Sequence, residues 1–254
     1  MSETLRLYAL KGAVTAAADG IGEAIARTFA KHGADILAVD SAASRVEAAL
    51  GRIKGISTLV VDDDSESLPD KFANAVRERL EGLDILVNNF PAFADSASDD
   101  LEGEGRFEPW LERIVTTTGS VLSLLKKSPA GRIINIGAMR SSFGREGAQQ
   151  FAAAEKALAE LTASQAAEYG AFGITANYIQ PGAIMTEASR IVFDADKSFR
   201  DDCIKRSAAG RLGEPVDVAK IALFLASDDS VFVSGTGIVA DGGTIPGSSA
   251  PRRK

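Results

Sequence analysis

A short glycine-containing segment near the N-terminus has the composition of a nucleotide-binding turn. Residues 15–22 read TAAADGIG and lie between an apolar run and a helical pattern. In such a strand, turn and helix unit, glycines let the backbone approach a pyrophosphate, which then lies at the positive end of the helix dipole. The pattern alone is weak evidence, because a helix that packs closely on its strand also requires glycine.

A carboxylate follows at the spacing that a bound nucleotide would require. Asp40 closes the second apolar run, 18 residues after Gly22. An acid at that position accepts hydrogen bonds from both hydroxyls of an adenosine ribose and repels a 2'-phosphate. The sequence therefore predicts a dinucleotide site that prefers NAD over NADP. The alternative explanation is that Asp40 is a solvated acid at a strand end.

Four more segments extend this pattern toward the C-terminus. They are DILVNN (84–89), IQPGAIMT (179–186), RLGEP (211–215) and SGTGIVADGG (234–243). With TAAADGIG they resemble, in order, the motifs TGxxxGxG, DxLVNNAG, PGxIxT, RxGxPxEvA and SxxxTGxxxxVDGG of the short-chain dehydrogenase/reductase family. The resemblance spans nearly the whole chain, and among family members it is to those like the 3-oxoacyl-ACP reductases.

This resemblance implies a set of cofactor contacts. It assigns the diphosphate to Thr15, Gly20, Ile21 and Gly22, the ribose to Asp40, the adenine to Asp62, the adenine-side ribose to Asn88, and the nicotinamide end to Pro181, Gly182, Ile184 and Thr186. Two departures weaken the expected binding. Ala16 replaces the family's first glycine, and Phe90-Pro91 replaces Ala-Gly, which adds bulk and removes a backbone donor.

The residues that perform the family's chemistry are replaced in this sequence. Relatives use an Asn, Ser, Tyr and Lys tetrad, in which the lysine lowers the tyrosine pKa so that the phenol exchanges a proton with the substrate during hydride transfer. In the family's register, the serine, tyrosine and lysine positions hold Ala138, Phe151 and Glu155. Alignment on Trp110 places Thr117 at the asparagine position, with Thr116 as the alternative.

A shift of the register by one residue does not recover the chemistry. It brings Lys156 to the lysine position but places Ala152 at the tyrosine and Met139 at the serine. Neither register supplies a phenol, and a carboxylate at Glu155 would raise the pKa of a nearby acid instead of lowering it. We therefore expect no ordinary carbonyl or alcohol redox activity.

Two interpretations of this substituted segment stay open. In the first, residues 151–154 and 157 are a small-residue helix face that packs against a twin helix. In the second, Glu155 is a general base, and Arg140, Ser141 or Ser142 contacts a substrate.

The order of apolar runs predicts the elements that position these residues. Brief β-branched runs alternate with helical patterns, which is typical of a parallel sheet with crossover helices. The expected strands are 13–15, 36–39, 56–61, 85–87, 133–136, 175–179 and 238–240. The fold class is therefore α/β, a Rossmann-type doubly wound parallel seven-stranded sheet with helices on both faces. One domain, 1–254, is expected, with 247–254 as a loose tail.

Composition excludes several classes of function. The net charge is -7, so the chain has no basic field for nucleic acid or anionic lipid, and it has no 18-residue apolar run or signal-peptide pattern. A cytoplasmic protein is expected. Cys203 and His32 are the sole cysteine and histidine, so neither a Cys/His zinc site nor a Ser-His-Asp triad can form.

Three hypotheses of function follow from these residues. The first is a pseudoenzyme that binds NAD as a sensor or as the silent subunit of an oligomer. The second is an enzyme with different chemistry, such as elimination or isomerisation, and the third is a purely structural protein. The helix expected at about Gln149–Tyr169 predicts a homodimer or homotetramer, or a mixed oligomer with an active relative, with the C-terminal strand as a second contact. The sequence names no substrate.

Overall fold

The computed structural model describes residues 5–41, 43–61, 68–90, 108–137 and 148–244. Seven parallel strands form one sheet in the order β3-β2-β1-β4-β5-β6-β7. They are β1 (Lys11–Thr15), β2 (Asp35–Asp40), β3 (Ile56–Val60), β4 (Ile85–Asn88), β5 (Arg132–Ile136), β6 (Thr175–Pro181) and β7 (Gly237–Ala240). Each lies where the sequence predicted a strand, so the predicted Rossmann-type α/β fold is confirmed.

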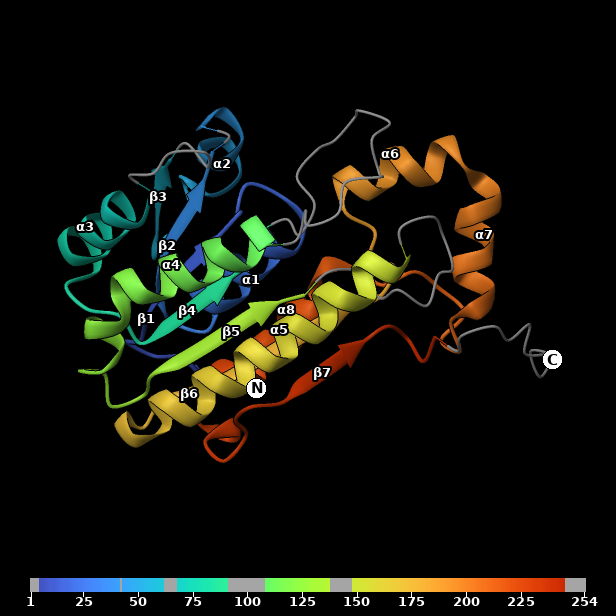
Figure 1. Cartoon of the computed structure of the whole chain (residues 1–254). Coiled ribbons are helices and arrows are strands. Elements are labelled where there is room, and N and C mark those ends of the chain that lie inside the picture. The colour runs from blue at the N-terminus through green and yellow to red at the C-terminus, as the bar shows by residue number, and fades with distance from the viewer. Residues whose placement is uncertain (1–4, 42, 62–67, 91–107, 138–147, 245–254) are drawn as a thin grey trace.

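Helices cover both faces of the sheet (Figure 1). They are α1 (Gly20–Lys31), α2 (Ala43–Leu50), α3 (Leu68–Leu80), α4 (Glu108–Leu125), α5 (Ala148–Tyr169), α6 (Glu187–Ala195), α7 (Lys197–Arg206) and α8 (Pro215–Ala226), with short 3-10 turns η2 (Gly170–Phe172) and η3 (Asp228–Ser230). One hydrophobic core joins α1 and α8 to the sheet, and a second core joins α3, α4 and α5 to the opposite face. None of the helices in the described ranges is both long and apolar enough to span a bilayer.

The sheet changes direction at β1. The chain moves outward from β1 through β2 to β3, and then returns to place β4 on the other side of β1. Crossover helices leave β1 and β4 in opposite directions at this point, so a crevice opens beyond the carboxyl ends of these strands, where open α/β sheets bind ligands.

Helix α1 shows how the local sequence forms this corner. Ile25 and Phe29, four residues apart on one face of the helix, are fully buried in the core. The helix ends at Lys31 with His32 as its C-cap, and Gly33 follows with a φ of 92°, the left-handed conformation that glycine accepts without strain. The N-terminus of α1 therefore lies where β1 ends.

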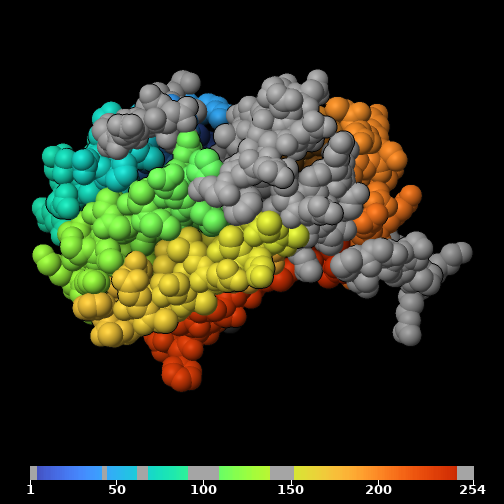
Figure 2. Space-filling view, in the orientation of Figure 1, coloured from blue at the N-terminus to red at the C-terminus, as the bar shows by residue number. Residues whose placement is uncertain are grey.

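Helices α6 and α7 extend past the carboxyl ends of the strands and form the orange end of the molecule in Figure 2. Phe193 of α6 and Cys203 of α7 are buried together, and the rings of Phe193 and Phe199 stack at 5.7 Å. Thr186 caps α6 through a hydrogen bond from the Ser189 amide at 3.0 Å. The start of α6 is thereby held beside the crevice.

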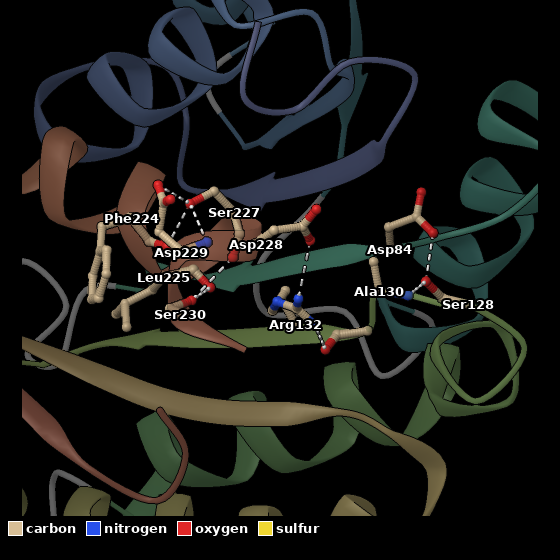
Figure 3. Close-up of polar contacts among 11 residues, drawn as sticks. Asp84, Ser128, Ala130, Arg132, Phe224, Leu225, Ser227, Asp228, Asp229 and Ser230 are labelled. Atoms are coloured by element: carbon tan, nitrogen blue, oxygen red, sulfur yellow. Dashed lines mark hydrogen bonds and ion pairs between the residues drawn. The ribbon is translucent and has the colours of Figure 1, made fainter. Parts of the chain in front are cut away.

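A polar cluster lies at the amino ends of the strands, opposite the crevice (Figure 3). Arg132, at the start of β5, is buried, and its guanidinium donates to the Gly131 carbonyl at 3.0 Å and lies 3.8 Å from the Asp228 carboxylate. Burial lowers the pKa of Arg132, while the charges of Asp228 and Asp84 oppose that shift. The cluster therefore joins the start of β5 to the segment after α8, at the end of the sheet away from the crevice.

Candidate nucleotide-binding site

The turn between β1 and α1 is tightly folded. Gly20 has a φ of 58°, in the left-handed region. A Cβ added at Gly22 would lie 2.1 Å from the Ala16 carbonyl oxygen, so only glycine fits there. Both glycines of the predicted motif are therefore required by the backbone path, whatever binds to the turn.

Hydrogen bonds hold this turn against the neighbouring strands. The Asn89 amide donates to the Thr15 hydroxyl at 2.9 Å, and the Asn89 side chain donates to the Ala16 carbonyl at 3.1 Å. The Ala17 amide donates to the Val39 carbonyl of β2 at 3.1 Å. The turn is thus fixed between the ends of β2 and β4. The role of Asn89 could not be predicted, because nothing in the residue pattern shows that its side chain faces the turn.

Ala16 adopts the conformation that its glycine equivalent in the motif would favour. Its φ is 46°, one of three positive φ values at non-glycine positions in the described chain. The left-handed conformation costs an L-residue roughly 1–2 kcal/mol relative to glycine. The expected strain at Ala16 is therefore present in the turn.

Two acids with different partners lie beside the turn. The Asp40 carboxylate accepts a hydrogen bond from the Ala18 amide at 2.8 Å. The Asp19 carboxylate forms an ion pair with Arg45 at 2.9 Å. Burial raises the pKa of Asp19, Arg45 opposes that shift, and the negative charges of Asp40, Glu187 and Glu23 add to it. Most of the charged groups that act on Asp19 are therefore negative.

A crevice of about 560 Å³ connects these residues. It runs from Asp40, Ser41 and Arg45, over the turn, to Ile136 and Gly137 at the end of β5 and to Thr186 and Ile191 of the α6 segment. An elongated ligand with one end at Asp40 and the other at Thr186 would have its middle over the positive N-terminus of α1. The geometry suits a dinucleotide.

Nine of the predicted cofactor-binding residues fall into three groups by their place in the structure. Gly20, Ile21, Asp40 and Thr186 line the crevice, whereas Thr15 and Gly22 shape the turn from inside. Ile184 is buried and pairs with Gly213, and a Cβ added at Gly182 would lie 2.6 Å from the Asp241 Cα. Pro181, which ends β6, is also buried. These three residues position the segment before α6, and none of them lines the crevice.

The side chain of Asn88 belongs to a buried polar network. Its side chain is completely buried and donates to the Thr118 hydroxyl at 3.1 Å and to the Asn135 side-chain oxygen at 2.9 Å. Asn135 in turn donates to Thr162 and Gln165 of α5. This network joins β4, β5, α4 and α5 inside the core. The Asn88 side chain therefore does not face the crevice, so a ribose contact would have to use its backbone, and the expected contact stays a prediction. No periodic signal in the sequence indicated this network.

Comparison with known proteins identifies the family to which this geometry belongs. The family model described as enoyl-(acyl carrier protein) reductase, adh_short_C2, matches residues 15–244. The chain belongs to the short-chain dehydrogenase/reductase family. The 3-oxoacyl-[acyl-carrier-protein] reductase FabG of Haemophilus influenzae is 35% identical over 242 residues, which cover 91% of this chain and 96% of that protein.

Two further relatives widen the range of described activities. Meso-2,3-butanediol dehydrogenase of Serratia marcescens is 31% identical over 94% of this chain and 96% of its own length. A solved structure from Beutenbergia cavernae, provisionally described as an NAD(P) dependent gluconate 5-dehydrogenase with bound NADP at low occupancy, has a TM-score of 0.82 and 28% identity. It covers 95% of this chain and 98% of that one. The family is thus clear, while the substrate differs between relatives.

The four positions of the family's tetrad are only partly visible in the structure. Thr117 is buried in α4, and its hydroxyl has no hydrogen-bond partner among the residues that the structure describes. Phe151 and Glu155 lie one helical turn apart on α5, and Glu155 is half-buried. Ala138 lies outside the described residues, as do Asp62 and Pro91, and their expected roles stay predictions.

Phe90 lines the crevice and also packs into the core. Its side chain is 6% exposed, and its carbonyl accepts a hydrogen bond from the Trp110 indole at 3.1 Å. The expected bulk beside the cofactor is therefore partly turned into the protein, and the crevice stays open over the turn.

Proposed function

We propose that this chain binds NAD(H) in the crevice over the β1–α1 turn and lacks the ordinary carbonyl and alcohol redox activity of its family. The observation that carries the proposal is a contrast between the crevice and the positions of the family's catalytic tetrad. Asp40 lies at one end of the crevice, Thr186 at the other, and the β1–α1 turn between them. The family's proton-transferring residues are replaced at Ala138, Phe151 and Glu155.

The residues present fit a dinucleotide. The tight turn with Gly20 and Gly22 leaves the N-terminus of α1 open to a diphosphate, and Asp40 lies at the end where a ribose would bind. A bound nicotinamide supplies a hydride in this family. A carbonyl that accepts a hydride also needs a proton, and neither Phe151 nor Ala138 has a side-chain proton to give.

We propose NAD as the preferred form because of the charge beside the turn. NADP is bound in one structural relative, so the family fold itself does not decide the preference. In this chain Asp19 and Asp40 both lie at the end of the crevice where a 2'-phosphate would be placed, and a like charge is repelled there. Asp40→Ala should narrow the difference in affinity between NAD and NADP.

Calorimetric titration with NAD, NADH, NADP and NADPH tests the binding, and a turnover screen tests the chemistry. We expect NAD or NADH to bind more tightly than the phosphorylated forms, and no NADH oxidation above background with aldehydes, ketones or acyl thioesters. Equal affinities would remove the NAD preference. Steady turnover on the order of 1 per second, a common enzyme rate, would reject the loss of activity.

A second candidate is an enzyme that uses Glu155 as a general base. The observation that favours it is burial, since Glu155 is half-buried whereas the neighbouring Lys156 side chain is 79% exposed. Elimination or isomerisation in the same pocket would then depend on this carboxylate. Glu155→Gln would abolish such an activity and leave nucleotide affinity unchanged, whereas a binding protein without turnover would show no activity to lose.

We also propose that the chain forms a dimer or tetramer through α5, with itself or with an active relative. In Figures 1 and 2, α4 and α5 lie side by side on one face of the molecule. Small residues point outward there, including Gly119 of α4 and Ala153, Ala163 and Ala167 of α5. Small side chains permit close approach between helices.

One residue expected in this α5 interface, which we call the seam, is buried inside its own chain. Ala154 was expected on the contact face, but it is completely buried against the protein's own core. The outward Ala153 is the appropriate test position. We expect Ala153→Arg to break the assembly in light scattering, and Ala48→Arg, at an exposed position of α2, to leave it intact. A native mass of 26.5 kDa, that of one chain, would reject the seam.

A further inference from the structure

The charges that line the nucleotide crevice are unequal in number. Asp19, Asp40 and Glu187 are its acids, and Arg45 is the one cation among the described residues that line it. A phosphate added to the ribose end of a ligand would therefore be repelled, unless Arg45 were available to pair with it. The state of Arg45 thus bears on which nucleotide the crevice accepts.

Asp19 holds Arg45 in place. Arg45 lies on α2, five residues after Asp40, and its guanidinium is 2.9 Å from the Asp19 carboxylate at the start of α1. The pair links the turn to the helix that follows β2, at the same end of the crevice as Asp40 and Ser41. Its two side chains are 57% and 30% exposed, so Arg45 has room to move if Asp19 is removed.

Asp40 is fixed by a different contact. One of its carboxylate oxygens accepts the Ala18 amide at 2.8 Å. The backbone of the turn therefore orients Asp40, whereas Asp19 is oriented toward Arg45. The two acids at this end have separate partners, and their effects on a ligand can be separated by substitution.

We infer that Asp19 is a positioning residue for nucleotide selection, because its ion pair occupies the Arg45 guanidinium, which would otherwise pair with a 2'-phosphate at this end of the crevice. Asp40 disfavours that phosphate by direct repulsion, and Asp19 engages the cation that would offset the repulsion. This inference rests on the proposed binding of NAD(H) in the same crevice. It assigns to Asp19 and Arg45 a joint role that neither residue has alone.

A double-mutant cycle on Asp19 and Arg45 tests the inference. Asp19→Asn keeps a residue type that is equally favourable at a helix N-cap, so the start of α1 should be retained. We expect this variant to lower the ratio of the NADP to the NAD dissociation constant by about tenfold, the scale of one charge-assisted hydrogen bond to a phosphate. Arg45→Gln in the otherwise native chain should change the ratio by less than about twofold, because Arg45 is already paired.

The double variant supplies the decisive measurement. In the Asp19→Asn background, Arg45→Gln should return the ratio to its native value. Glu23→Gln is the matched control, since Glu23 lies in the first turn of the same helix but pairs with Arg27 at 2.7 Å. This control should leave the ratio within about twofold of the native value.

Calorimetric affinities for NAD and NADP distinguish the outcomes. An unchanged ratio in Asp19→Asn would overturn the inference, and so would a lowered ratio that persists in the double variant, because Asp19 would then act by direct repulsion alone. A higher ratio in Arg45→Gln alone would show that Arg45 already pairs with the phosphate, which also overturns it. If neither nucleotide binds the native chain or any variant, the proposed function itself fails.

Discussion

Two regions of the molecule, the β1–α1 turn and the elements β5 and α5, differ in how they depart from the family's pattern. At the β1–α1 turn the backbone conformation is intact, although Ala16 makes it more strained than a glycine would. Along β5 and α5 the described residues form the expected strand and helix, while the register proposed for the sequence places Ala138, Phe151 and Glu155 at the family's serine, tyrosine and lysine positions. Under the proposed function, the contrast teaches that the fold depends on packing and turn geometry, while the reaction depends on a few side chains whose replacement the fold tolerates.

The largest expected effect comes from restoring those side chains. The variant Thr117→Asn/Ala138→Ser/Phe151→Tyr/Glu155→Lys should raise NADH-dependent reduction of a carbonyl substrate above the native background. A positioned general acid contributes about 10²–10⁴-fold, so we expect a gain on that scale. A stopped-assay or continuous absorbance measurement of NADH consumption over a panel of ketones and acyl thioesters would record it.

The matched control for this gain is the same variant with Phe151 retained. Without the phenol, the other three substitutions should give no more turnover than the native chain. The contradicting outcome is a full variant that binds NADH with native affinity and still shows no turnover on any substrate. The replaced tetrad side chains would then not be sufficient to explain the absence of activity.

The second prediction concerns the buried polar network around Asn135. Asn135→Ala removes the partner of Asn88, Thr162 and Gln165, all of which are buried. Unpaired buried polar groups cost about 1–3 kcal/mol, so the free energy of unfolding should fall by about that amount. Urea unfolding measures this change. Thr116→Ala, on the exposed side of α4, should change it by less than about 0.5 kcal/mol.

Features that depend on local sequence were predictable in this chain, whereas contacts between distant residues were not. All seven strands and the glycine turn were predictable, because apolar periodicity and a glycine-containing turn are local properties. The side chain of Asn88 donates to Asn135, 47 residues away, and no local pattern in the sequence indicated that contact. The Asp19–Arg45 pair was likewise not anticipated, since no periodicity connects a turn to the following helix.

The third prediction tests the strain at the nucleotide end. Ala16→Gly removes a methyl group from a residue with a φ of 46°. Glycine accepts this conformation, so the variant should be more stable by about 1 kcal/mol, after the larger entropy of an unfolded glycine is subtracted. Thermal unfolding would show a higher Tm. Ala17→Gly is the matched control, because no positive φ is recorded at Ala17, and it should lower the Tm.

The smallest expected effect is a dependence of stability on pH that sets Asp19 against Asp217. Burial and the nearby acids raise the pKa of Asp19, whereas the hydrogen bond from Arg211 lowers the pKa of Asp217. The folded chain binds a proton at Asp19 more tightly than the unfolded chain does. The contribution of Asp19 to stability is therefore full below its unfolded pKa, near 4, and is lost as the pH rises through its folded pKa. Asp217 has the opposite sign, because its contribution is present above the unfolded pKa and is lost as the pH falls through the folded one. Asp19→Asn should consequently raise the Tm at pH 7 relative to the native chain, and Asp217→Asn should lower it. Both differences in Tm should shrink toward pH 3.

The contradicting outcome would be a lower Tm for Asp19→Asn at pH 7. The ion pair between Asp19 and Arg45 would then stabilise the fold by more than the burial of the Asp19 carboxylate destabilises it.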